Sequence, residues 1–230
     1  MDVIARIDDA RRECNVLEHP FYQRWSAGEL SIEELGFYAG EYRHAVVALA
    51  RASEDVAAKV GAEHRASLER HAAEERSHVA LWDAFAAAAE GAAGEGTGEG
   101  AGGGTAARSP LGETLACARA WTAGEDALER LAVLYAIEAS QPEIAKTKLA
   151  GLTERYGYRP EGPAVEYFSL HATLDVEHAR QASELIAELM SDDKLEARAQ
   201  ADRMVERATA ALRGNWELLD GVDRRFARVG

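Results

Sequence analysis

The chain has 230 residues, of which 47% are hydrophobic and 29% charged, and it carries a formal net charge of -14. This length and composition fit one folded unit over residues 1–230 with a substantial hydrophobic core. The negative charge argues against nucleic acid and anionic membranes as partners, because phosphate binding depends on a basic patch. No stretch approaches the roughly 20 apolar residues of a membrane span, and the first residues lack the apolar region of a signal peptide. We therefore expect a soluble protein of the cytoplasm.

Cysteine contributes little to the expected chemistry. Cys14 and Cys117 are the only two cysteines, too few for a disulfide scaffold. Both lie within helical patterns, so we expect reduced, packed thiols without a catalytic role. Without further sulfur ligands, structural zinc and iron–sulfur clusters are disfavoured.

The first part of the chain has the apolar spacing of helices. A first helix is predicted over residues 2–18, before Pro20, because the residue preceding a proline disfavours helical geometry. A capping box begins at Ser31, with a glutamate three residues later, and opens a helix over residues 31–59. A third helix is predicted over residues 63–90, which are rich in Ala, Glu and Arg.

The rest of the chain is also helical after a glycine-rich stretch. Residues 91–104 contain eight glycines, a composition that does not repay the entropy of ordering, so a flexible loop is predicted over residues 91–105. Helices are then predicted over residues 111–122, 126–156 and 163–190, with one or two more over residues 192–229. Pro142 should kink the second of these, since proline lacks the N–H that bonds the preceding turn. Nothing reads as a strand, so the fold class is all-α.

One octapeptide, His171-Ala-Thr-Leu-Asp175-Val-Glu-His178, places two imidazoles and a carboxylate at offsets of four and three residues. On a helix these three side chains share one face, within a sector of roughly 60°. A single His–Asp pair would be explained by a solvated polar face. The triple on one face is instead typical of a helix that presents ligands to a metal ion.

Two other helices carry side chains that fit the same site. Glu138 follows the apolar run Leu-Ala-Val-Leu-Tyr-Ala-Ile and should be buried, where a carboxylate needs a cation, a donor or a metal. In the third helix His78 follows Glu75 by three residues and Glu74 by four, and either spacing puts a carboxylate beside the imidazole. Glu41, next to the inward stripe of the second helix, is a further candidate, although such a glutamate more often lies at the edge of a buried face.

Together these residues form a mixed nitrogen and oxygen ligand set on three helices. Such sets suit iron or manganese, and helical bundles hold carboxylate-bridged di-iron centres between facing helices. Six ligands of this kind suit two metals with coordination positions left open for dioxygen. The sequence therefore predicts a di-metal centre.

Five stretches, in order along the chain, resemble a known family. They are Glu18-His-Pro-Phe-Tyr22-Gln-Arg-Trp-Ser-Ala-Gly-Glu-Leu30, His78-Val-Ala-Leu-Trp82, Tyr135-Ala-Ile-Glu138-Ala-Ser-Gln-Pro142-Glu-Ile-Ala, Gly-Leu-Thr-Glu-Arg-Tyr156-Gly, and residues 171–178. Over residues 17–190 the chain is similar to the chlamydial proteins associating with death domains (CADD), which belong to the haem-oxygenase-like di-metal oxidases. The wider fold includes the TenA thiaminases and the PqqC oxidase, and the resemblance implies a compact bundle of seven or eight helices.

The resemblance also implies two bound iron ions, or one iron and one manganese, with dioxygen as co-substrate and an external electron donor. The implied ligands are one carboxylate of the third helix together with His78, Glu138, His171, Asp175 and His178. The family places that carboxylate seven residues before the histidine, where this chain has His71. Related oxidases use Glu-x-x-His, so we favour Glu75, keep Glu74 as the alternative, and rank His71 and Glu41 as additional candidates. A homodimer is expected by fold analogy.

Three residues are candidates for catalysis through the same resemblance. In the family, a tyrosine matching Tyr22 is the source of the para-aminobenzoate ring, and a lysine matching Lys148 is the donor of its amino group. Tyr167, four residues before His171, matches a family tyrosine near the metals, with plain packing as the alternative role. The family also has a tyrosine just before the helix-borne glutamate, where this chain has Ile137, which weakens a relay through that position.

The predicted function is a non-haem di-metal oxygenase that makes para-aminobenzoate for folate synthesis from its own Tyr22. Three alternatives stay open: an oxidase of an external amino-acid-like or fatty-acid-like substrate, a metal-free thiaminase or PqqC-like oxidase, and a partner-binding protein. The thiaminase needs a nucleophilic cysteine, and Cys117 is poorly matched to that place. No surface motif supports a binding protein.

Overall fold

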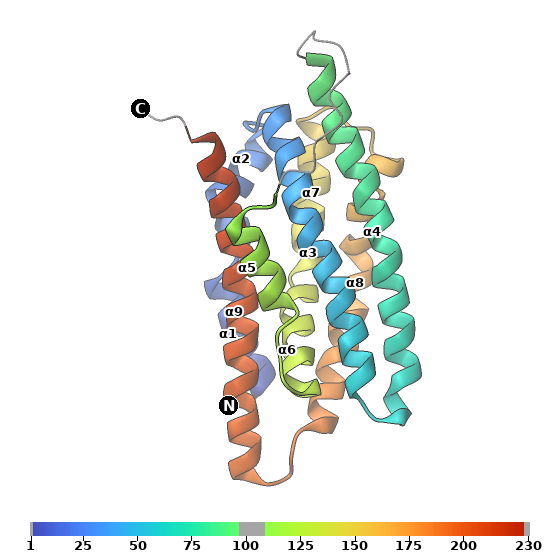
Figure 1. The fold of residues 1–230 in the computed structure, drawn as a ribbon, viewed down its shortest axis with the longest axis vertical. Coiled ribbons are helices and arrows are strands. Elements are labelled where there is room, and N and C mark those ends of the chain that lie inside the picture. Colours follow the sequence, from blue (N-terminus) through green and yellow to red (C-terminus); the bar gives the residue numbers. More distant parts are fainter. Residues whose placement is uncertain (1, 97–108, 228–230) are drawn as a thin grey trace.

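The computed structural model describes residues 2–96 and 109–227, and this part of the chain is built from helices (Figure 1). No strand occurs among the described residues, which confirms the all-α prediction. The helices are α1 (Val3–Glu13), a short 3-10 helix (Val16–Glu18), α2 (Pro20–Ala27), α3 (Ile32–Lys59), α4 (Ala62–Gly96), α5 (Gly112–Trp121), α6 (Ala127–Glu138), α7 (Gln141–Glu154), α8 (Pro163–Leu189) and α9 (Lys194–Phe226). None of these described helices has both the length and the apolar character needed to cross a membrane.

Local side-chain chemistry sets the ends of the early helices. The hydroxyl of Ser31 accepts from the backbone N–H of Glu34, and the Glu34 carboxylate accepts from the N–H of Ser31, which is the predicted capping box of α3. In α2, Pro20 occupies the first position, where its missing N–H costs nothing. The same helix ends at Gly28, whose φ of 77° lies in the left-handed region that glycine adopts freely.

The region predicted as one helix with a kink at Pro142 is two helices. α6 ends at Glu138 and α7 begins at Gln141, so Pro142 lies in the first turn of a new helix, where no N–H is required of it. The chain therefore breaks at the proline instead of bending there. This break and the short helix α2, which was not predicted, bring the described part of the chain to nine α-helices. The break leaves Glu138 at the last position of α6.

Two other boundaries differ from the prediction. α1 ends at Glu13, because the Asn15 side chain accepts from the N–H of Leu17 and begins a separate 3-10 helix. α4 continues to Gly96, past the predicted start of the loop at residue 91, since alanine and glutamate favour helix among these glycines. The remainder of the predicted flexible loop, residues 97–105, lies outside the described residues. The final helix is a single one, α9.

Packing brings the helices with predicted ligands together. α8 contacts α4, α6 and α7, while α3 contacts α4, α5 and α6. The long helices α3, α4, α8 and α9 run along the long axis of the bundle (Figure 1). Their inner faces enclose one apolar core whose largest fully buried side chains include Trp25, Trp82, Trp121, Tyr22, Tyr38 and Tyr42. α4, α6 and α8 are therefore neighbours across this core.

Candidate metal centre

Seven buried ionisable side chains from three helices converge between α4, α6 and α8. They are His71, Glu75 and His78 from α4, Glu138 from α6, and His171, Asp175 and His178 from α8, each at most 8% exposed. Their ligand atoms form three overlapping groups, each with atoms within 4.8 Å of one another: His71 with Glu138 and His178; Glu75 with His78 and His171; and Glu75 with Asp175 and His178. The third group joins the other two, so the cluster has two adjacent places for a cation.

α4 and α8 contribute the same pattern of side chains. His71, Glu75 and His78 have the spacing of His171, Asp175 and His178. The two helices meet in opposite directions, because the ring centre of His71 lies 4.1 Å from that of His178, and the ring centre of His78 lies 4.6 Å from that of His171. The cluster is thus nearly symmetric, with the two helix-borne carboxylates in the middle. Glu138 belongs to the end formed by His71 and His178, and it makes the two ends different.

Many ligand atoms of this cluster have no ordinary hydrogen bond. Among the described residues, nine buried nitrogen or oxygen atoms of these seven side chains lack a partner of suitable geometry, including both carboxylate oxygens of Glu138 and of Asp175. Burying such groups without partners costs free energy, so native proteins avoid it unless the groups have a task. Imidazole and carboxylate donors without sulfur suit iron or manganese. The residues present therefore fit a two-iron group.

The alternatives in α4 are separated by the direction of each side chain. Glu75 is 2% exposed, and its Oε1 lies 3.2 Å from Nδ1 of His78. The Glu74 side chain is 53% exposed and meets Nε2 of His178 at 3.2 Å from outside the cluster. His71, ranked only as an additional candidate, lies within the cluster with Nε2 2.9 Å from Oε1 of Glu138. The matching spacing of the two helices is a signal in the sequence that would have identified His71, whereas the prediction rested on the family's carboxylate position alone.

The charges of the cluster shift the pKa values of its members. Burial disfavours protonated His178, but the carboxylates of Asp175, Glu138 and Glu75 outweigh it and raise the pKa of His178 to about 9. Burial also opposes the charge on His71, yet Glu138 raises the pKa of His71 above its ordinary value. Burial is the main cause of the raised pKa of Asp175. A bound cation would replace these protons, because metal ligands bind in their deprotonated forms.

Tyr167 orients one of the imidazoles. Nδ1 of His171 lies 2.7 Å from the backbone oxygen of Tyr167, and the two rings stack with centres 4.0 Å apart. A carbonyl that accepts from Nδ1–H leaves Nε2 free to bind a metal, and it holds the ring in place. The Nε2 atom is indeed among the buried atoms without a hydrogen bond.

Glu41 lies apart from the cluster and supports α5. Its carboxylate accepts from the backbone N–H of Leu111 at 3.0 Å and from the hydroxyl of Thr114. Leu111 is the N-cap of α5 and has no side chain able to cap the helix, so Glu41 takes over that task from α3. None of the potential metal groups among the described residues includes Glu41.

Lys148 of α7 is enclosed by aromatic rings. It is 1% exposed, and Nζ lies 4.3 Å from the ring centre of Tyr42 and 5.4 Å from that of Tyr22. Rings of Tyr38, Trp82 and Phe168 surround the same amine at 5.4 to 5.7 Å. Burial lowers the pKa of Lys148 well below its ordinary value, which favours a neutral, nucleophilic amine. Sequence reasoning missed this cage, because its rings come from several different helices.

Tyr22 lies in the same enclosed region. It is 1% exposed, and its hydroxyl is 2.8 Å from the hydroxyl of Tyr38. Burial raises the pKa of Tyr22 well above its ordinary value, so the phenol stays protonated. A series of ring contacts leads from here to the cluster of candidate ligands, with Tyr38 and Trp82 centred 6.1 Å apart and Trp82 and Tyr167 4.9 Å apart. The ring of Trp82 therefore lies between the Lys148 amine and Tyr167, which stacks on His171 of the cluster.

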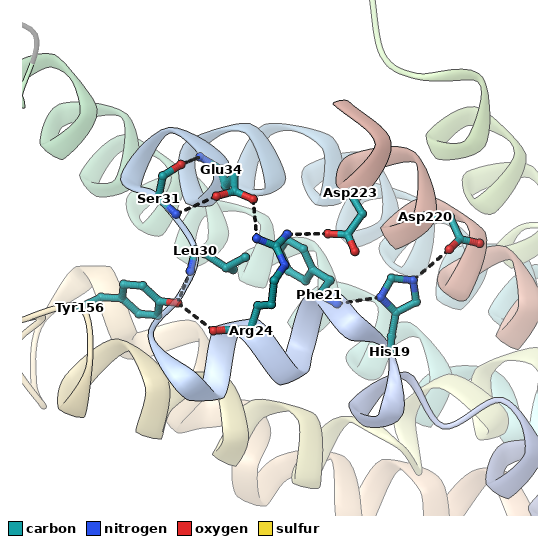
Figure 2. Close-up of polar contacts among 9 residues, drawn as sticks. All are labelled: His19, Phe21, Arg24, Leu30, Ser31, Glu34, Tyr156, Asp220 and Asp223. Carbon is teal, nitrogen blue, oxygen red and sulfur yellow. Dashed lines mark hydrogen bonds and ion pairs between the residues drawn. The ribbon is translucent and has the colours of Figure 1, made fainter. Parts of the chain in front are cut away.

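A polar network outside this enclosed region holds α2, the helix that carries Tyr22 (Figure 2). Arg24 donates to Glu34 of α3 and to Asp223 of α9, each at 2.7 Å. His19 accepts from the N–H of Phe21 through Nδ1, and its Nε2 lies 3.1 Å from Oδ1 of Asp220. These contacts tie both ends of the short helix to longer neighbours.

The protein-family model described as "Iron-containing redox enzyme" matches residues 38–214, which include all seven residues of the cluster. The chain belongs to this family of iron-containing redox enzymes. Its fold is that of two solved structures: a domain of unknown function with a heme oxygenase-like fold from Shewanella denitrificans (17% identity, TM-score 0.76, 98% of this chain and 94% of that chain) and a TenA homologue from P. horikoshii (16% identity, TM-score 0.71, 97% and 99%). The predicted haem-oxygenase-like fold is thereby confirmed.

Two curated relatives of this iron-containing redox enzyme have a named activity. A protein named 4-aminobenzoate synthase from Chlamydia trachomatis is 30% identical over 233 residues, which cover 96% of this chain and 91% of that protein. A protein of the same name from Nitrosomonas europaea is 29% identical over 237 residues, which cover 96% of this chain and 91% of that protein.

Cys117, the cysteine considered for a thiaminase, is fully buried in α5, where burial raises the pKa of its thiol. This finding offers no support for a thiaminase.

Proposed function

We propose that this iron-containing redox enzyme makes 4-aminobenzoate from its own Tyr22, with the side-chain amine of Lys148 as the nitrogen source. The observation that carries the proposal is that both side chains are buried among the same aromatic rings, where Nζ of Lys148 lies 5.4 Å from the Tyr22 ring centre. These rings adjoin a cluster suited to two metal ions. The curated relatives named 4-aminobenzoate synthase add independent support.

The seven clustered residues would hold two iron ions, or one iron and one manganese. His71, His178 and Glu138 would bind one ion, and Glu75, His78 and His171 the other, with Asp175 between them. When bound, the metals would supply one-electron oxidising chemistry with dioxygen and an external electron donor. Tyr167 would act as a positioning residue by holding the ring of His171.

The chain's own residues prepare Tyr22 and Lys148 for reaction. The buried rings of Tyr38, Tyr42 and Trp82 exclude water around the amine. An amine with a strongly lowered pKa keeps its lone pair available for forming a bond to an oxidised ring. Transfer of this nitrogen would break the Cε–Nζ bond of Lys148 and the ring C–O bond of Tyr22, and cleavage of the Cα–Cβ bond of Tyr22 would release the product, with dioxygen and the external electron donor supplying the redox equivalents. The hydrogen bond between Tyr22 and Tyr38 gives the phenol proton a fixed neighbour when the ring is oxidised.

Substitution of Tyr22 tests this proposal. Tyr22→Phe should retain its metals but make no 4-aminobenzoate when reduced iron and dioxygen are supplied, as followed by metal analysis and mass spectrometry. The matched control is Tyr135→Phe, because Tyr135 is also a buried tyrosine but bonds to Asp8, away from Lys148. Full product from Tyr22→Phe would contradict the proposal and would favour an external substrate.

A further inference from the structure

The line of histidines on α4 continues beyond the metal cluster towards the surface. His64 precedes His71 by seven residues, just as His71 precedes His78. Seven residues span about 10.5 Å and nearly two turns of helix, so the three imidazoles lie along one face. Nε2 of His64 lies 3.3 Å from Oε1 of Glu188, near the end of α8. The seam between α4 and α8 therefore carries a third ligand-type pair outside the cluster.

A cavity connects this outer pair with the cluster. It has a volume of about 200 Å³, and it is lined by His64 and Glu188 as well as by His71 and His178. The Glu188 side chain is 64% exposed and that of His64 is 20% exposed, so the outer pair is accessible from solvent. His71 is 8% exposed, and its Nε2 is among the buried atoms without a hydrogen bond. The cavity thus joins an accessible imidazole–carboxylate pair to a buried ligand atom.

The walls and the mouth of the cavity differ in character. Four leucines from three helices line the cavity: Leu68, Leu131, Leu134 and Leu185. Two largely exposed carboxylates of α8, Glu184 and Glu188, lie at the mouth, where Glu184 also pairs with Arg180, and the whole chain is strongly acidic. Such a mouth raises the local concentration of cations and repels anions. Imidazole and carboxylate at one end and a ligand cluster at the other suit a divalent metal ion.

We propose that this cavity is the loading route for divalent metal ions, with His64 and Glu188 as the outer site where an ion arrives from solvent. The inference rests on the proposed two-metal centre, because a buried centre needs a path by which its ions enter. An ion held by His64 and Glu188 would be exposed to solvent on one side and would face the cavity on the other. Besides Glu184, which pairs with Arg180, the rest of the lining offers only the neutral side chains of Ser67 and Gln181, so the next imidazoles that the ion meets are those of His71 and His178.

The test measures the rate of metal binding separately from the final metal content. Metal-free protein is mixed rapidly with divalent cobalt, and the visible absorption of the bound ion is followed in time. His64→Ala combined with Glu188→Gln should slow loading about tenfold, the lower end of the range for lost electrostatic steering. The same variant should reach the same final metal content. The control pair is His44→Ala with Glu54→Gln, which replaces the same residue types on α3.

A second variant blocks the cavity without removing a ligand. Leu185→Trp fills the space, whereas Leu189→Trp makes the same change on α8 at a residue that does not line the cavity. Loading should slow for Leu185→Trp and should keep its wild-type rate for Leu189→Trp. Wild-type loading rates in both Leu185→Trp and the double variant, with full metal content, would overturn the route but leave the metal centre intact. A wild-type protein that never binds cobalt at the cluster would instead overturn the proposed function.

Discussion

Two polar regions of this bundle differ in whether their charged side chains have hydrogen-bond partners within the protein. In the network around Arg24, each charged group has a partner within the protein, as Glu34 and Asp223 show (Figure 2). In the cluster between α4, α6 and α8, charged groups are more deeply buried but retain atoms without hydrogen bonds. The first region is complete as a structural device and fastens a helix. The second keeps buried ligand atoms that a bound cation would satisfy, which is what the proposed metal centre requires.

The largest expected effect follows from removing one ligand of the cluster. Glu138→Gln should lower the affinity for divalent metal by at least about 100-fold, because loss of outer partners alone costs 10- to 100-fold. Isothermal titration of the metal-free protein measures this change. Glu34→Gln, in the Arg24 network, is the matched control and should leave the affinity unchanged. Equal effects of the two variants would remove the distinction between the regions.

The bound metal should also stabilise the fold. With free metal at about 100 times its dissociation constant, one site adds about 2.7 kcal/mol to the free energy of unfolding. Thermal melts with metal and with a chelator measure the difference. Arg24→Ala should keep this gain, because its ion pairs lie outside the cluster, whereas Glu138→Gln should lose most of it. A gain that persists in Glu138→Gln would place the metal elsewhere.

The buried amine of Lys148 should make the free energy of unfolding depend on pH. The pKa of Lys148 in the folded protein lies well below its ordinary value near 10.5, so the unfolded chain binds one more proton between these two values. Stability should therefore rise with pH in that window, by up to about 1.4 kcal/mol per pH unit. Urea unfolding at about pH 7 and about pH 9 measures the slope. Lys148→Met should abolish this contribution, and an unchanged slope would mean that the amine is not neutralised by burial.

The smallest effects should have opposite signs in the two regions. In metal-free protein, Asp175→Asn should raise the free energy of unfolding by about 1 kcal/mol, because burial raises the pKa of Asp175 and the fold therefore disfavours its charged form. Arg24→Ala should lower it by about 1 kcal/mol, a modest value because the side chain is 32% exposed. Chemical denaturation of both variants gives the sign directly. A destabilising Asp175→Asn would indicate that the cluster is satisfied without metal.

Local spacing was enough to predict much of the candidate site. His171, Asp175 and His178 lie on one face because a helix repeats every 3.6 residues, and Glu138 stood out in an apolar run. The rotation of α4 about its own axis, which decides which of its side chains face the core, could not be predicted from local spacing. Whether Glu74 or Glu75 faces inward depends on how α4 packs on α8, and both lie beside His78 in the sequence.

In the fold as well, features set by contacts within one helical turn could be predicted, whereas features set by the packing of several helices could not. The capping box at Ser31 fixed the start of α3 correctly, since all its contacts lie within one turn. The sequence predicts a kink at Pro142, but the structure has a new helix there, because the following residues start one with proline in its first turn. The aromatic cage of Lys148 could not be predicted, since its rings come from α2, α3, α4 and α8.

The most direct test of the central claim is to label the two side chains before reaction. Protein is produced with tyrosine that carries a heavy-carbon ring and lysine that carries heavy nitrogen at its side-chain amine, and it is then supplied with iron, a reductant and dioxygen. Mass spectrometry should find 4-aminobenzoate with both labels, and peptide mapping should find the modified residues at Tyr22 and Lys148. Product without the ring label would contradict the account.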